Sequence, residues 1–226
     1  MITGETRLVG LLGDPVSGSL SPRMHNAAFA ALGLDWAYVP LRVNAESLDE
    51  AVRGLAALGF VGANVTTPHK LAVVQLVETD APSVNTLLVQ DDRVLGFTTD
   101  AAVLEGLDPE RPAILGDGGS ATAFAEALPY ARRFSRRGEW PPAVAEADIV
   151  VNATSEREQV LAELVTGQTL VDLPYPRTAT ARVAEEGGAK VVDGLDVLVA
   201  QGAAAFELWT SLPAPVDVMR AAVRSA

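Results

Sequence analysis

Short apolar runs alternate with amphipathic segments along the first hundred residues. The apolar runs are closed by turn residues and predict strands over residues 7–13, 36–43 and 62–68, with a hairpin over 83–90 and 93–99 that turns at Asp91 and Asp92. The amphipathic segments predict helices over residues 21–33, 47–59 and 69–78. Ser21 is expected at the N-cap of the first helix, with Pro22 at its first helical position. This alternation is typical of an α/β fold with a mostly parallel sheet.

A second unit is predicted to begin near Asp100, with a linking helix over residues 101–107. Residues 113–121 predict a strand, a glycine turn and the start of a helix, and further strands are expected over 130–134, 148–154, 169–173 and 189–194. Two helices, separated by Pro213 and Pro215, complete the chain. Periodicity alone leaves open which domain these last helices cover.

Composition narrows the class of protein. With 226 residues, 49% hydrophobic and 20% charged, the chain fits one large or two small globular domains. It has no apolar run of bilayer length and no signal-like N-terminus, so a cytoplasmic location is expected and a membrane partner is not. The net charge of −12 argues against a nucleic-acid partner. Without cysteine, and with only two histidines, no metal centre is expected.

A glycine turn, GDGGSA, follows the strand predicted near residue 113. Gly116, Gly118 and Gly119 would let a pyrophosphate approach the backbone, with Ser120 at the helix N-terminus. About twenty residues on, a unit that binds NAD would offer an acid to the ribose. The chain has Ser135, Arg136 and Arg137 there, and guanidinium groups suit the 2′-phosphate of NADP. The alternatives are a plain glycine turn and a solvated arginine run.

Polar residues also mark the N-terminal half. Ser19 and Ser21 precede a helix, where hydroxyls and unpaired backbone N–H groups form an anion site, although Ser21 could simply cap the helix. The strand in GANVTTPHK alternates small apolar residues with Asn64 and Thr66 and leads to Lys70, which indicates a polar ligand. Lys70 could donate a proton to a carbonyl that is being reduced, with Asp100 holding it in position. Taken singly, an exposed Lys70 and a helix-capping Asp100 are the simpler interpretations.

Together these motifs resemble the shikimate dehydrogenase family. The blocks SGSLSP, GANVTTPHK, SVNT, GFTTD, GDGGSA, DIVVNATS, DLPY and DGLDVLVAQGAAAFELW occur in the family's order along nearly the whole chain. The resemblance implies a substrate domain over residues 1–99 with 198–226 and a Rossmann-like NADP-binding domain over 100–197, the C-terminal helices returning to the substrate domain. It implies an NADP-dependent oxidoreductase that reversibly reduces 3-dehydroshikimate to shikimate in chorismate and aromatic amino-acid biosynthesis, as a monomer or homodimer.

The resemblance also implies roles for individual residues. Lys70 and Asp100 match the catalytic pair, and Ser19 and Ser21 match the serines that hold the substrate carboxylate. The residues that match those around the substrate ring are Asn64, Thr66, Asn85, Tyr175 and Gln201. The residues that match the NADP contacts are Gly116, Gly118, Gly119, Ser120, Ser135, Arg136, Arg137, Thr154, Leu173 and Gly194.

The chain departs from the family in several places. Gly18 and Thr98 replace the usual histidine and asparagine, and Asp117 brings a carboxyl group into the glycine turn. Only residues 135–147, which include Pro141 and Pro142, separate two strands whose parallel crossover normally contains a helix. We therefore expect one helix of the cofactor domain to be missing or reduced to a loop. Two alternatives follow: a quinate/shikimate-type dehydrogenase of altered specificity, and a shikimate-binding module with little catalysis.

Overall fold

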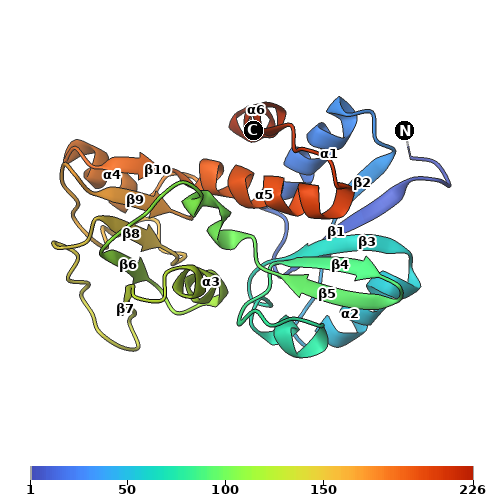
Figure 1. The fold of residues 1–226 in the computed structure, drawn as a ribbon, viewed down its shortest axis with the longest axis horizontal. Helices are drawn as coiled ribbons and strands as arrows, with labels where there is room; N and C mark the ends of the chain where they lie inside the picture. Colours follow the sequence, from blue (N-terminus) through green and yellow to red (C-terminus); the bar gives the residue numbers. More distant parts are fainter. Residues whose placement is uncertain (1, 226) are drawn as a thin grey trace. The chain divides into compact units, whose positions relative to one another are not determined.

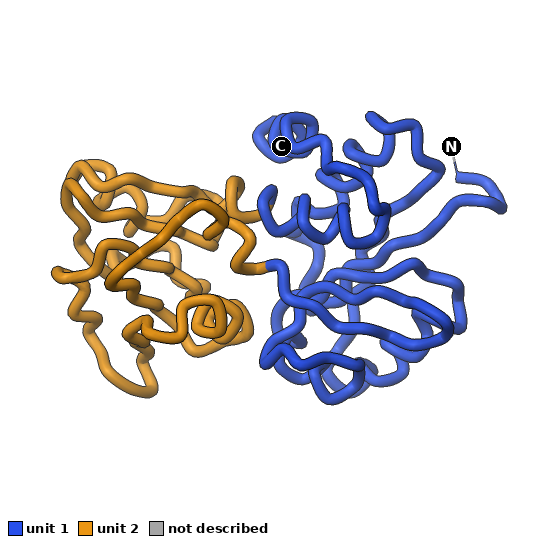
Figure 2. The backbone as a smooth tube through the Cα atoms, viewed as in Figure 1, with its two compact units in different colours: residues 1–99, 199–226 blue, residues 100–198 orange. Residues whose placement is uncertain are grey.

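The computed structural model describes residues 2–225, which fold into two compact units. Unit 1 comprises residues 1–99 and 199–226, and unit 2 comprises residues 100–198 (Figure 2). Each unit is built around its own five-stranded sheet. Of the two C-terminal helices, the part from residue 199 onward belongs to unit 1.

The sheet of unit 1 has the strand order β2-β1-β3-β4-β5. Its strands are β1 (Arg7–Gly13), β2 (Trp36–Arg42), β3 (Phe60–Val65), β4 (Thr86–Gln90) and β5 (Arg93–Phe97). Strands β2, β1 and β3 are parallel, whereas β4 and β5 form an antiparallel hairpin beside β3. The predicted hairpin is confirmed: Asp91 and Asp92 have φ angles of 51° and 61°, which suit the tight two-residue turn of a right-twisted ribbon. The sheet is thus mixed, not mostly parallel.

Helices cover both faces of this sheet (Figure 1). They are α1 (Ser21–Ala31), α5 (Gly194–Thr210) and α6 (Val216–Arg224) on one face, and α2 (Leu48–Ala57) with the 3-10 helix η1 (Ala72–Leu76) on the other. Ala63 and Val65 of β3 belong to the apolar core beneath α2. Gly62 faces α5, because a Cβ added there would lie 2.6 Å from Trp209 Nε1. Side chains alternate along a strand, so Asn64 points to the same face as Gly62.

Unit 2 has an all-parallel sheet with the order β10-β9-β8-β6-β7. Its strands are β6 (Pro112–Leu115), β7 (Arg132–Phe134), β8 (Ile149–Asn152), β9 (Thr169–Asp172) and β10 (Lys190–Val192), and its other elements are η2 (Asp100–Leu104), α3 (Gly119–Ala127) and α4 (Ala179–Glu186). Strands β6, β8 and β9 are almost entirely buried and apolar, as expected for a parallel sheet covered on both faces.

Two crossovers of unit 2 are loops. Within the described residues, 135–148 and 153–168 contain no helix, which confirms the expected loss in the first and adds the second. Val144 and Leu164 from these loops enter the core, and Trp140 packs against it. The side-chain amide of Gln168 donates to the carbonyls of Val144 and Ala147 at 3.0 and 2.7 Å, which satisfies backbone groups that a helix would otherwise pair.

Two helix predictions were wrong in type. Residues 69–78 form only the short 3-10 helix η1, because the chain must be extended again at Glu78. There it pairs beside β5: the Glu78 N–H donates to Val94 O and the Gly96 N–H donates to Glu78 O, both at 2.9 Å. The predicted linking helix at 101–107 is likewise the 3-10 helix η2, over Asp100–Leu104.

Candidate functional site

In unit 1, polar residues gather at the edge of the sheet where β1, β3 and β5 end. Because β4 is antiparallel to both neighbours, its first residue, Thr86, pairs with Asn64 of β3 and with Phe97 of β5. Residues at the start of β4 therefore meet residues at the ends of β3 and β5. This register explains why blocks as far apart in sequence as GANVTT, SVNT and GFTT come together.

Asn64 is the first centre of a buried hydrogen-bond network. Its side chain is 4% exposed and its Oδ1 accepts a hydrogen bond from the hydroxyl of Tyr38 at 2.8 Å. Its Nδ2 donates to Asn85 O at 3.1 Å and to Thr86 Oγ1 at 3.0 Å. The amide is therefore held in one orientation by partners on β2 and at the start of β4.

Asn85 is the second centre. Its Nδ2 donates to Thr99 Oγ1 at 3.0 Å and to Gln201 Oε1 at 3.2 Å, while its Oδ1 accepts from the Thr99 N–H at 2.7 Å. Gln201 comes from α5 and reaches the network across the helix–sheet interface within unit 1. The structure thus brings together three residues singled out from the sequence: Asn64, Asn85 and Gln201.

The expected position of Ser21 at the N-cap of α1 was wrong. Ser21 is the first helical residue rather than the N-cap, and Leu20 stands at the N-cap position. Ser19 Oγ accepts the Ser21 N–H at 3.2 Å, so Ser19 makes a local side-chain bond at the helix start. The misassignment arose because the proline rule located the helix start only to within one residue. Both hydroxyls still lie at the N-terminus of α1, which favours an anion.

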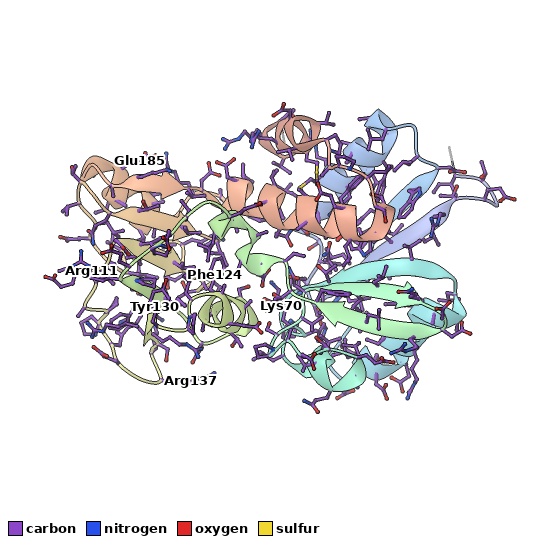
Figure 3. The ribbon with its side chains drawn as sticks, in the orientation of Figure 1. Lys70, Arg111, Phe124, Tyr130, Arg137 and Glu185 are labelled. Atoms are coloured by element: carbon purple, nitrogen blue, oxygen red, sulfur yellow. The ribbon has the colours of Figure 1, made fainter. Side chains whose placement is uncertain are left out.

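The turn that leads to Lys70 is fixed by its backbone. The Thr66 N–H donates to Leu12 O at 2.8 Å, and Lys70 O accepts from the Val84 N–H at 3.0 Å, next to Asn85. Figure 3 shows Lys70 at the end of the unit 1 sheet where β5 finishes. Asp100 is the first residue of unit 2 and is buried. The pairing of Lys70 with Asp100 stays a prediction.

In unit 2, the turn after β6 requires glycine. Gly116 has a φ of +126°, and a Cβ there would lie 3.0 Å from Ala153 O. A Cβ added to Gly118, the N-cap of α3, would meet no atom of the described residues within 4 Å. The space beside Gly118, where α3 begins, is therefore open, which leaves room for a pyrophosphate.

The arginines after β7 already have partners within unit 2. Arg136 donates to Gln159 Oε1 at 3.0 Å and to Glu156 Oε2 at 3.4 Å. Backbone N–H groups of Glu158 and Gln159 lower the pKa of Glu156, so this partner stays anionic. Arg137, labelled in Figure 3 on the loop after β7, lies 3.7 Å from the carboxylate of Asp117. The carboxyl group in the glycine turn thus has a cation beside it.

A second polar network, in unit 2, includes Thr154, which is also a predicted cofactor contact. Thr154 Oγ1 donates to Asn152 Oδ1 at 2.8 Å, and Asn152 Nδ2 donates to Asp172 Oδ1 at 2.7 Å. Burial raises the pKa of Asp172, against the opposing effect of the hydrogen bond from Thr178. These bonds tie the loop after β8 to the end of β9.

Of the remaining predicted residues, Leu173 and Tyr175 lie in the loop that follows β9, and Gly194 is the first residue of α5. Gly194 opens α5 against that loop, since a Cβ there would lie 2.7 Å from Leu173 O. Tyr175 is half-buried in the same loop. Gly194 and Leu173 therefore make a close backbone contact, and their role as cofactor contacts stays a prediction.

The sequence analysis did not identify several residues of these networks. Tyr38, Thr86 and Thr99 were read only as strand or hairpin residues, and Asn152 and Asp172 only as strand ends. For the other four, the signal that could have found them is polar residues at or near strand ends, whereas Tyr38 lies inside β2 and carries no such signal. Among the described residues, no three His, Asp or Glu side chains cluster in a way that could hold a metal ion, and none of the helices is long and apolar enough to cross a membrane.

Comparisons with known proteins show what this chain is similar to. Residues 11–87 match the shikimate dehydrogenase substrate binding domain, and residues 194–224 match the shikimate 5′-dehydrogenase C-terminal domain. The NADP(+) shikimate dehydrogenase of Anaeromyxobacter sp. (strain Fw109-5) is 42% identical, with 99% of this chain and 98% of the relative covered. That alignment spans 272 positions, more than the 226 residues of the chain, so the relative has residues that this chain lacks.

Solved structures show the same fold. Shikimate 5-dehydrogenase from Thermus thermophilus, in complex with NADP(H) and shikimate, superposes with a TM-score of 0.86 at 30% identity, covering 97% of this chain and 99% of that one. Quinate dehydrogenase from Corynebacterium glutamicum, in complex with NAD, superposes with a TM-score of 0.81 at 25% identity, covering 98% and 99%. On its sequence, its fold and these relatives, the chain belongs to the shikimate dehydrogenase family.

Proposed function

We propose that the chain is an NADP-dependent shikimate dehydrogenase, which reversibly reduces 3-dehydroshikimate to shikimate on the way to chorismate and the aromatic amino acids. The observation that carries the proposal is the network in unit 1 that joins Asn64, Asn85 and Gln201 at one edge of the sheet. A set of amides held in fixed orientation is what recognition of a hydroxylated ring needs, because only a correctly placed hydroxyl can pair with them. The chain would work in the cytoplasm, as a monomer or homodimer.

Unit 1, with Leu198, serves as the substrate domain. Ser19 and Ser21 bind the substrate carboxylate at the N-terminus of α1, where the helix dipole favours an anion. The hydroxyl groups of the ring are bound by Asn64, Thr66, Asn85 and Gln201, with Tyr175 from residues 100–197.

Residues 100–197 serve as the cofactor domain. The pyrophosphate lies at the turn formed by Gly116, Gly118, Gly119 and Ser120, where the backbone geometry fits it. Ser135, Arg136 and Arg137 bind the 2′-phosphate, and Thr154, Leu173 and Gly194 make the remaining contacts. When bound, NADPH supplies the hydride.

Lys70 handles the proton. In the direction of reduction its Nζ donates a proton to the substrate oxygen as the carbonyl becomes a hydroxyl, and in oxidation it accepts that proton. Asp100 holds the same hydroxyl and orients the lysine. Because Val84 fixes the backbone of Lys70 beside Asn85, the proton donor and the residues that bind the ring share one rigid edge.

The test is oxidation of shikimate with NADP, followed by the absorbance of NADPH, with quinate and NAD as parallel arms. Turnover on shikimate with NADP well above the other three combinations is expected. Preference for quinate would establish the altered-specificity alternative, to which the fold shared with quinate dehydrogenase also lends support.

A second candidate is a shikimate-binding module with little catalysis. It is favoured by the two crossovers of unit 2 that contain no helix, because the proposed cofactor site then lacks the helices that would border it. A folded protein that binds shikimate but turns over none of the four combinations would establish this candidate instead.

A further inference from the structure

Tyr38 is held in place by two residues of α1 within unit 1. It lies on β2, which is separated from β3 by β1, and it is 2% exposed. Asn26 of α1 bonds both backbone groups of Tyr38: its Oδ1 accepts the N–H and its Nδ2 donates to the carbonyl, each at 2.9 Å. The phenol ring stacks on His25 with centroids 4.6 Å apart and planes 10° apart. The position of the hydroxyl therefore follows from the packing of α1 on β2.

His25 provides an apolar support for that ring. It is fully buried among Phe29, Tyr38 and Trp209, and neither of its ring nitrogens has a hydrogen-bond partner among the described residues. A flat neutral ring in this position restricts the tilt of the Tyr38 phenol without competing for its hydroxyl. The ring has few other orientations available in a close-packed layer.

The bonds of Asn64 define which groups it can offer. Both hydrogens of its Nδ2 are used, on Asn85 O and Thr86 Oγ1. Its Oδ1 accepts from Tyr38 and, counted over the described residues, from no other group. A carbonyl oxygen has two lone pairs, so one acceptor position remains at Asn64 and no donor position. A 180° flip of the amide would bring its oxygen against two groups that now accept from it.

From these contacts we propose that Tyr38 is a positioning residue. Its hydroxyl locks the Asn64 amide so that the only group Asn64 presents to the substrate is a hydrogen-bond acceptor, which selects a ring hydroxyl over a ring carbonyl at that position. The inference rests on the proposed function, because it assumes that Asn64 contacts the substrate. Tyr38 acts through Asn64 and does not touch the substrate.

The test is a double-mutant cycle read by calorimetric binding of shikimate. The variants are Tyr38→Phe, Asn64→Ala and the pair, with Tyr130→Phe as a matched control, since Tyr130 also donates its hydroxyl to a carbonyl, Pro109 O at 2.8 Å, but lies in unit 2 outside the network (Figure 3). Tyr38→Phe should weaken shikimate binding about tenfold, because Asn64 loses the bond that orients it. The same change in the Asn64→Ala background should have no further effect.

Steady-state kinetics and thermal melting separate positioning from a general structural role. Tyr38→Phe should raise KM for shikimate about tenfold with kcat within about twofold, whereas general damage would lower kcat as well. The inference is overturned if Tyr38→Phe binds shikimate like the wild type, or if its effect persists in full without Asn64. Wild-type protein that fails to bind shikimate would overturn the proposed function itself, and the inference with it.

Discussion

The two units arrange polar residues in the same way but differ in how the faces of their sheets are covered. Each places polar residues at the edge where its parallel strands end, and each ties them into a buried network. In unit 1 the network is neutral and helices cover both faces of the sheet, whereas in unit 2 it contains Asp172 and two crossovers are loops. Residues such as Trp140 and Val144 fill the core where a helix would lie.

This difference shows where the fold tolerates shortening. A crossover helix covers the face of a sheet, and a loop with well-placed apolar side chains can replace that cover. The residues at the strand ends cannot be replaced in this way, since their positions depend on register and on buried hydrogen bonds. Unit 2 accordingly keeps its glycine turn and the Asn152–Asp172 bond.

Lys70→Ala tests the chemical role assigned to unit 1 and should have the largest effect. Loss of the proposed proton donor should reduce kcat about a thousandfold, while shikimate affinity changes much less, because other residues bind the ring in the proposed site. Lys190→Ala is the matched control, since Lys190 is exposed at the start of β10. Turnover that survives in Lys70→Ala would remove Lys70 as the acid and base.

His25 makes the stability of unit 1 depend on pH. Burial lowers its pKa from 6.5 to about 3, so the folded chain leaves it neutral while the unfolded chain protonates it as the pH falls below 6.5. Through His25 alone, the free energy of unfolding should therefore fall by about 1.4 kcal/mol for each pH unit between 6.5 and about 3.

Denaturation at pH 7 and pH 5 measures this dependence. A Trp140→Phe background leaves Trp36 and Trp209 as reporters, both in unit 1. Between the two pH values, the Trp140→Phe chain should lose about 2 kcal/mol more of its free energy of unfolding than the same chain with His25→Phe added. The added change keeps a stacked ring and removes the titration. Equal losses in the two chains would show that His25 does not titrate as its burial implies.

Arg136→Ala tests the cofactor specificity of unit 2 and should have the smallest effect. The dissociation constant for NADPH should rise about tenfold with little change for NADH, because only NADPH carries the 2′-phosphate. The effect is moderated by Gln159 and Glu156, which already hold Arg136. Arg133→Ala, a change to another exposed arginine of the same cluster, is the control. Equal effects on both cofactors would exclude a 2′-phosphate contact at Arg136.

Much of the architecture followed from local patterns. Apolar runs predicted the strands, and Asp91-Asp92 predicted the hairpin, because a short-range signal determines each. The missing helix after β7 was predicted from chain length and from Pro141-Pro142. The helix at 69–78 was not formed, because the pairing of Glu78 beside β5 is a tertiary contact that no local pattern contains.

Several residues of the unit 1 network could be predicted from the sequence, but the hydrogen bonds that join them could not. Asn64, Asn85 and Gln201 could be identified from motifs, yet their hydrogen bonds depend on the register of β3 with β4 and on the packing of α5. Tyr38 escaped notice because it lies in a strand that reads as apolar. Ser21 was expected at the N-cap of α1 but is its first helical residue, since helix starts are located from sequence only to within about one residue.

Calorimetric titration of the purified chain with NADPH and with shikimate, each alone, tests the central claim most directly. The claim is that unit 1 holds an intact substrate site and that the shortened unit 2 still binds NADP. We expect each ligand to saturate one site per chain, with NADPH bound more tightly than NADH. Saturable binding of shikimate without binding of NADPH would contradict the account and leave a substrate-binding module in its place.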